Sequence, residues 1–136
     1  MRLVALAALA LVVVAPASAA TVTAQLTTST RAPYAGEAWR YTVTVRIGGK
    51  PVAARMRLQV LAGRTVVGCW KRSRLVRCRG ASLGDWIAFR GRRTGVTRFT
   101  AASVGDRLTF SAVVELGGAT LRLQAPVTVR RAASVR

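Results

Sequence analysis

Apolar and polar side chains alternate along much of the chain, and this alternation restricts the fold more than any other feature. From Trp39 to Ile47 every odd position is apolar or aromatic, and every even position is arginine or threonine. Similar alternation returns over residues 54–60, 108–116 and 121–129. A period of two residues predicts strands with one buried face. Because no stretch after residue 20 repeats every 3.6 residues, we expect an all-β fold.

Turn residues separate these segments and set the number of strands. Glycines and a proline occupy Gly48–Pro51, and Gly117-Gly118 is typical of a hairpin turn. Shorter strands are expected over residues 22–28, 65–71, 75–79, 86–90 and 96–101. About seven to nine strands spaced about ten residues apart predict an antiparallel β-sandwich. A closed up-and-down barrel is the alternative, but Pro126 favours an edge position for the last strand, because proline donates no backbone hydrogen bond.

The first twenty residues have the layout of a secretory signal peptide. Arg2 is followed by an apolar run of 12 residues from Leu3 to Val14 and then by small residues through Ala20. As a helix this run rises only about 18 Å, which is short for a retained membrane anchor. We therefore expect cleavage after Ala19 or Ala20, a β-sandwich domain over 21–130 and a short basic tail over 131–136. No membrane span is expected after cleavage.

The residue types present argue against catalysis. The chain contains no histidine, and its only carboxylates are those of Glu37, Asp85, Asp106 and Glu115. Catalytic triads and imidazole metal sites are therefore excluded, and four scattered acids make a calcium site improbable. The glycine pairs match no phosphate-binding fingerprint. We expect a chain that is not an enzyme and that carries neither a cofactor nor a metal.

Several short turns resemble those of bacterial extracellular immunoglobulin-like modules. The residues that carry this resemblance are Gly49-Lys50-Pro51-Val52 with the strand that follows, Ala35-Gly36-Glu37 and Val104-Gly105-Asp106. The resemblance covers roughly residues 21–130 and implies an immunoglobulin-like sandwich without any particular activity. Members of this class serve as spacers, adhesion modules and binding domains. The cysteines depart from the antibody pattern, because they are too close in sequence to join facing sheets.

Cys69 and Cys78 are expected to form a disulfide. If the two face each other across a hairpin, Ser73-Arg74 forms the bend, although a four-residue loop fits equally well. An exported chain meets an oxidising environment, and a spacing of nine positions is not a zinc-binding pattern. Two free thiols are the alternative.

One face of the same hairpin combines an aromatic ring with guanidinium groups. The candidate anion-binding residues are Trp70, Arg72, Arg74, Arg77 and Arg79. Such a surface can hold an anion and stack on a flat group. In the competing interpretation, Trp70 packs on the domain, and the aliphatic parts of the arginine side chains cover the Trp70 ring.

The formal net charge of +18 predicts attraction to acidic partners. The bias of 20 arginines to 2 lysines also fits a high-GC coding sequence, which needs no partner. No motif of a specific nucleic-acid-binding module is present. Our preferred hypothesis is a secreted, non-catalytic structural or protein-interaction module of the cell envelope or exterior, with an unknown protein as partner. The alternative is a cationic surface that binds acidic polymers, such as cell-wall polyanions or nucleic acid, or anionic membranes.

Overall fold

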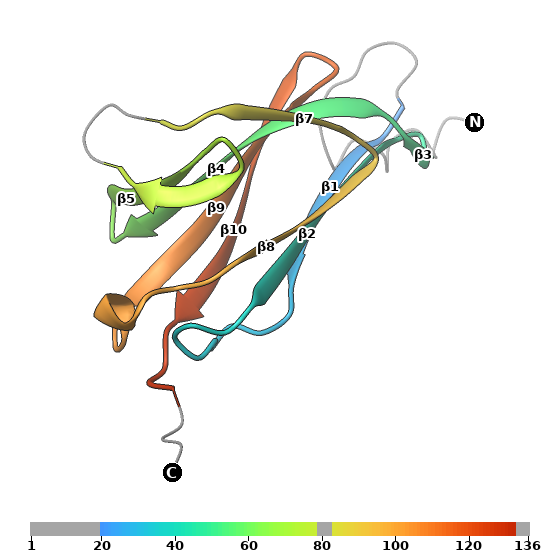
Figure 1. Ribbon diagram of the computed structural model, residues 1–136. Coiled ribbons are helices and arrows are strands. Elements are labelled where there is room, and N and C mark those ends of the chain that lie inside the picture. The colour runs from blue at the N-terminus through green and yellow to red at the C-terminus, as the bar shows by residue number, and fades with distance from the viewer. Residues whose placement is uncertain (1–19, 79–82, 133–136) are drawn as a thin grey trace.

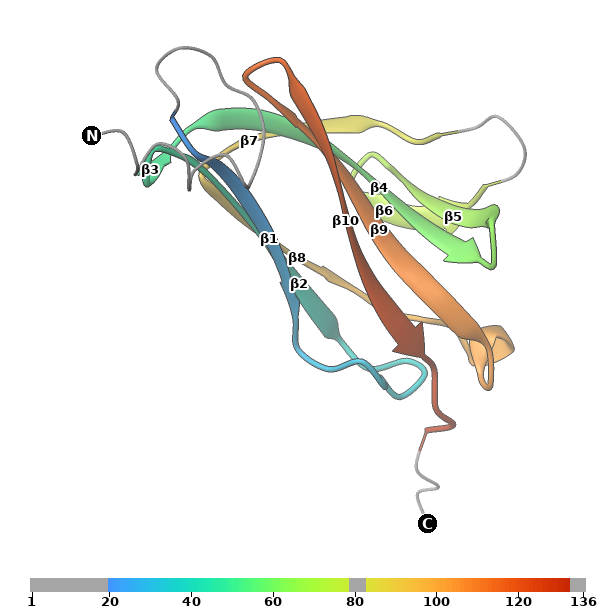
Figure 2. The ribbon, with the colours of Figure 1, turned by 180° about the vertical axis from the view of Figure 1, so that it is seen from behind.

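The computed structural model describes residues 20–78 and 83–132, and these residues form two antiparallel β-sheets. Nearly all of the predicted signal peptide, Arg79 and the end of the basic tail lie outside the described residues. Figures 1 and 2 show the sheets as two layers. In the described part of the chain no helix is long and apolar enough to span a membrane.

The smaller sheet contains β1 (Val22–Thr28), β2 (Trp39–Ile47), the two-residue β3 (Lys50–Pro51) and β8 (Arg92–Thr97). β1 pairs with one edge of β2, and β3 and β8 pair with the other. β2 has the predicted bounds, and its burial follows the predicted alternation, with Trp39, Tyr41, Val43 and Val45 buried.

The larger sheet has the strand order β10-β9-β4-β5-β6. Its strands are β4 (Ala53–Ala62), β5 (Thr65–Lys71), β6 (Arg74–Arg77), β7 (Trp86–Arg90), β9 (Arg107–Leu116) and β10 (Ala119–Thr128). β7 pairs with the first half of β4, and β5 pairs with the second half. β10 lies at the edge, as Pro126 predicts, and Gly117-Gly118 forms the predicted turn, with φ angles of 54° and 83°.

One segment crosses from the larger sheet to the smaller one. β7 continues into β8 (Figure 1), and Gly91, the residue between them, has a φ of 70° that allows the chain to bend there. The Gly91 carbonyl accepts a hydrogen bond from Val45 N–H, and the Gly91 N–H donates to Val52 O, both at 2.8 Å. The predicted strand over 96–101 is wrong in its bounds, because β8 ends at Thr97 and a 3-10 turn, η1 (Ala101–Ser103), follows.

The two sheets enclose a core that centres on aromatic rings. Phe110 of β9 is fully buried, and its ring centroid lies 5.0 Å from that of Trp39 and 4.9 Å from that of Tyr41. The Trp70 ring packs edge-on against Phe110 at 5.6 Å. Burial raises the pKa of the Tyr41 hydroxyl, and the charge of Arg93 opposes this shift. These rings join strands of both sheets and so hold the layers together.

The disulfide between Cys69 and Cys78 is present, but the predicted hairpin register is wrong by two residues. Cys69 lies opposite Val76, and the two cysteines are diagonal neighbours with their Cα atoms 5.7 Å apart. The bend consists of Arg72 and Ser73, both with positive φ (52° and 65°), as a type I′ turn requires. A two-residue shift leaves every side chain on its predicted face, because successive side chains alternate between faces.

Candidate functional site

The structure separates the residues of the predicted anion-binding hairpin. Trp70 is only 2% exposed, because the face that carries it is turned toward the core. Trp70 therefore cannot stack on a ligand, and its assignment to the binding surface is corrected. Arg72, Arg74 and Arg77 are exposed, whereas Arg79 lies outside the described residues.

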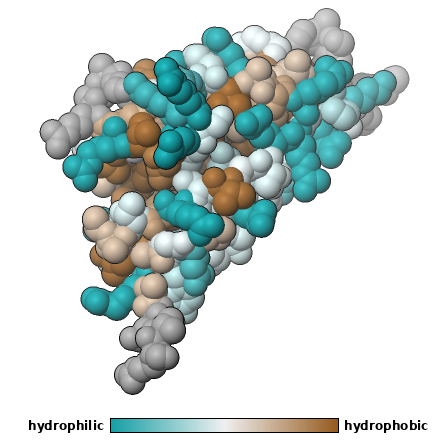
Figure 3. Space-filling view, in the orientation of Figure 1, coloured by the Kyte–Doolittle hydropathy of each residue, from teal (hydrophilic) through white to brown (hydrophobic). Residues whose placement is uncertain are grey.

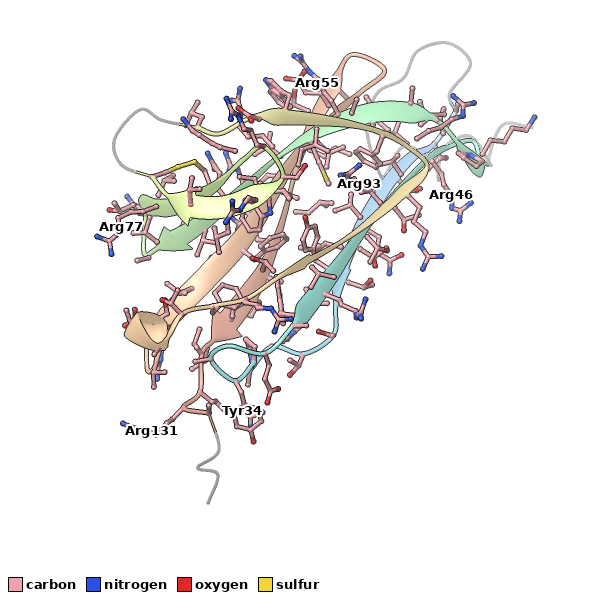
Figure 4. All side chains as sticks on the ribbon, in the orientation of Figure 1. Tyr34, Arg46, Arg55, Arg77, Arg93 and Arg131 are labelled. Carbon is pink, nitrogen blue, oxygen red and sulfur yellow. A yellow bond between two sulfur atoms is a disulfide. The ribbon has the colours of Figure 1, made fainter. Side chains whose placement is uncertain are left out.

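The three exposed arginines of this hairpin do not converge on one point. Arg72 lies in the turn, where its backbone N–H donates to the Asp85 carboxylate at 2.9 Å. Arg74 and Arg77 lie at the two ends of β6, and their odd spacing directs them to opposite faces. Figure 4 shows Arg77 pointing away from the body of the domain. The hairpin therefore offers separate cations and no assembled pocket.

An aromatic ring among guanidinium groups does occur, but at Trp86. The guanidinium carbons of Arg55 and Arg57 each lie 4.2 Å from the centroid of the Trp86 ring. Trp86 begins β7 and lies directly opposite Arg57 of β4 in the antiparallel ladder. Both arginines lie on the outer face of the larger sheet, since the alternating neighbours Met56 and Leu58 are buried. We call Arg55, Arg57 and Trp86 the Trp86 cluster.

Neighbouring strands extend the Trp86 cluster across the sheet. Glu115 of β9 lies opposite Arg55 and forms an ion pair with it at 2.7 Å. On β10, Arg122 donates from Nη1 to the Ser111 hydroxyl at 3.2 Å. Arg122 and Arg57 both lie opposite Val113, one on each side of β9. Three guanidinium groups and one tryptophan ring therefore share this outer face.

The electrostatics of this face favour an anionic ligand. The Arg57 Nε is inaccessible to solvent and has no hydrogen-bond acceptor among the described residues. The Arg55–Glu115 pair is the one ion pair within 4.0 Å in the described part of the chain, and the Arg55 side chain is still 51% exposed. Both guanidinium groups lie over the Trp86 ring, and the exposed part of the Arg55 guanidinium can still donate to phosphate, sulfate or carboxylate oxygens, whereas the buried Arg57 Nε cannot reach a ligand.

The other arginines are distributed over the molecule. Arg46 lies on the outer side of the smaller sheet and Arg93 lies between the sheets (Figure 4). Arg98 donates to the Gly36 carbonyl at 2.8 Å, and Arg130 stacks on the Tyr34 ring with 3.9 Å between the guanidinium carbon and the ring centroid. These four arginines thus lie at different places on the molecule.

Neither a search for metal-binding side chains nor comparison with known proteins identifies a further functional site. Within residues 20–78 and 83–132, no three His, Cys, Asp or Glu side chains are grouped so that they could hold a metal ion. The chain matches no protein-family model, no curated protein and no solved structure.

Proposed function

We propose that the chain is an exported, non-catalytic immunoglobulin-like module that acts through its surface as a structural or protein-interaction domain of the cell envelope or exterior. The observation that carries this proposal is the arrangement of its two sheets. Aromatic side chains join these sheets, and most of the described arginines are exposed, although Arg93 lies between the sheets.

The strand order supports the immunoglobulin-like part of the proposal. In such domains strands A, B and E share one sheet, and G, F, C and C′ form the other. The order β1-β2-β8 corresponds to A-B-E, and β10-β9-β4-β5 corresponds to G-F-C-C′. After β1 the chain also reaches the segment just beyond β10, where Tyr34 and Arg130 form an isolated parallel bridge. Phe110 of β9 contacts Trp39 and Tyr41 of β2. These two strands correspond to F and B, which a disulfide joins in antibody domains.

The positions of the acidic residues support a non-catalytic role. Glu115 pairs with Arg55, and Asp85 holds the turn between β5 and β6 through the Arg72 N–H. Both carboxylates thus have structural partners. A general base also needs a nucleophile or substrate proton within hydrogen-bond reach. With no histidine in the chain, binding is the activity that its side chains suit best.

A second candidate function is the binding of acidic polymers, and the Trp86 cluster favours it. Arg55, Arg57 and Arg122 present three guanidinium groups on one sheet face, and Glu115 is the one acid that pairs with them. A polyanion that binds several cationic side chains releases its counterions, so the affinity of the protein for the polyanion falls as the salt concentration rises.

Heparin retention across a salt series separates the two candidates. If the second candidate is right, the triple variant R55Q/R57Q/R122Q elutes at lower salt than R40Q/R46Q/R92Q. Both triples remove three positive charges from the outer face of a sheet. The slope of log affinity against log salt is expected to fall by about 2 to 3 for the first triple, which removes contacting cations.

The W86A variant provides a test at unchanged net charge. It is expected to weaken heparin retention, because the Arg55 and Arg57 guanidinium groups lose the ring that positions them. Equal elution of the two triple variants, together with unchanged retention of W86A, would show that net charge alone accounts for the attraction to heparin. That result would leave the structural or protein-interaction module as the function.

A further inference from the structure

A groove lies between the β5–β6 hairpin of the larger sheet and the segment that follows β8. Its volume is about 730 Å³, within the size range of ligand sites. Apolar side chains of the larger sheet and of the segment after β8 line it, including those of Val60, Leu75, Phe99 and Leu108. Figure 3 shows hydrophobic residues gathered among hydrophilic ones on this face, where β5 and β6 lie in Figure 1. The groove is separate from the Trp86 cluster, which lies on the outer face of the larger sheet.

An unpaired strand edge borders this groove. β6 ends the larger sheet and pairs only with β5 among the described strands. The Cys78 N–H donates to Val67 O at 3.2 Å, which makes Val67 and Cys78 a hydrogen-bonded pair of the antiparallel ladder. Since such pairs alternate along a ladder, Leu75 and Arg77 direct their backbone N–H and C=O groups away from β5. No described residue forms a hydrogen bond with these backbone groups.

The charge around the groove limits what can occupy it. Arg77 and Arg98 both line the groove, and Asp106 is the one acidic residue in its lining. A second copy of the chain would bring another net charge of +18 to this edge, and the like charges would repel. A partner with acidic side chains would instead be attracted to this positively charged edge, which also carries the exposed Arg74 on the other face of β6.

We propose that an extended, acidic segment of a partner protein adds to β6 as a further strand of the larger sheet. Its backbone pairs with Leu75 and Arg77, and alternate apolar side chains enter the groove. The carboxylates between them point to the opposite face, where Arg74 of β6 lies. Strand addition of this kind takes affinity from main-chain hydrogen bonds and specificity from side-chain pockets. The inference rests on the proposed role as an interaction module and names the surface and the chemistry of the partner.

The test uses a heptapeptide of alternating glutamate and valine, blocked at both ends, and amide NMR of the folded domain. We expect saturable shifts at the Leu75 and Arg77 amides and at groove residues, with a Kd of 1 mM or lower. The same two amides should exchange more slowly with solvent when the peptide is bound. A peptide of the same sequence with alternate backbone nitrogens methylated should bind at least tenfold more weakly, because it cannot pair with the strand.

A variant pair tests the strand edge from the side of the protein. Arg77→Pro removes an outward N–H that the hairpin does not use, and Arg77→Ala removes only the side chain and its charge. Binding at least tenfold weaker in R77P than in R77A is expected. The methylated peptide keeps the proposal testable if R77P fails to fold.

The inference would be overturned by equal binding of the methylated peptide, by equal binding of a lysine–valine peptide, or by no binding at millimolar concentration. It would also be overturned by shifts at Leu75 and Arg77 that depend on protein concentration without any peptide. The last result would indicate pairing between two copies. A peptide that binds only on the Trp86 face would overturn this inference while leaving a binding role intact, and the heparin series judges the cationic face independently.

Discussion

Replacement of Phe110 by alanine is expected to lower the free energy of unfolding by about 3 to 5 kcal/mol. Phe110 is fully buried and its ring contacts those of Trp39, Tyr41 and Trp70. The substitution removes the apolar surface of one ring and leaves a cavity that three large, interlocked neighbours cannot readily fill. Edge-to-face contacts between aromatic rings add to the loss. Urea unfolding followed by tryptophan fluorescence measures the change.

Val113 provides the comparison for this experiment. It lies on the same strand as Phe110 but on the opposite, partly exposed face. The V113A variant is expected to lose about 1 kcal/mol or less, since little buried surface disappears. A loss for F110A no larger than that for V113A would contradict the placement of the core at this ring.

Removal of the disulfide is expected to cost about 2 to 3 kcal/mol. The bond between Cys69 and Cys78 closes a short loop and restricts the unfolded chain. It also joins β5 to the far end of β6, the strand that borders the groove. Urea unfolding of the double variant C69A/C78A, compared with the oxidised parent, gives the difference.

The reduced parent protein serves as the control for that measurement, because it keeps both sulfur atoms in place. Reduction should reproduce most of the loss seen in the double variant. A double variant as stable as the oxidised parent would show that the pair does not restrain the unfolded chain.

Strand positions could be predicted from the sequence where alternation and turn chemistry agree. Trp39–Ile47 has strict alternation and one buried side, so both its bounds and its buried face are correct. The turn at Gly117-Gly118 requires positive φ angles that glycine adopts easily, so its two strands pair as expected. Pro126 marks an edge strand because it cannot donate a ladder hydrogen bond.

The β5–β6 hairpin shows where local sequence is not enough. Arg72 and Ser73 adopt positive φ angles that neither residue favours, so no residue type marked the bend. Both faces of the hairpin carry apolar and basic residues, and local alternation does not tell which one is buried. That choice depends on Phe110, which lies far along the chain in β9 and packs against Trp70.

The Trp86 cluster could not be predicted for a similar reason. Its members come from β4 and β7, whose pairing depends on how the chain between them folds back. A tryptophan at the start of a short strand gives no indication of its neighbours across the sheet. Arg55 and Arg57, two positions apart in β4, were the available signal, since they mark an outer face on which a partner ring can lie.

The most direct test of the whole account is the intact mass of the protein recovered from the envelope or the medium of the organism that makes it. An exported module predicts a chain that lacks residues 1–19 or 1–20. It also predicts a mass two hydrogens below that of the dithiol form, because Cys69 and Cys78 are joined. Full-length protein with two free thiols, found inside the cell, would contradict the account.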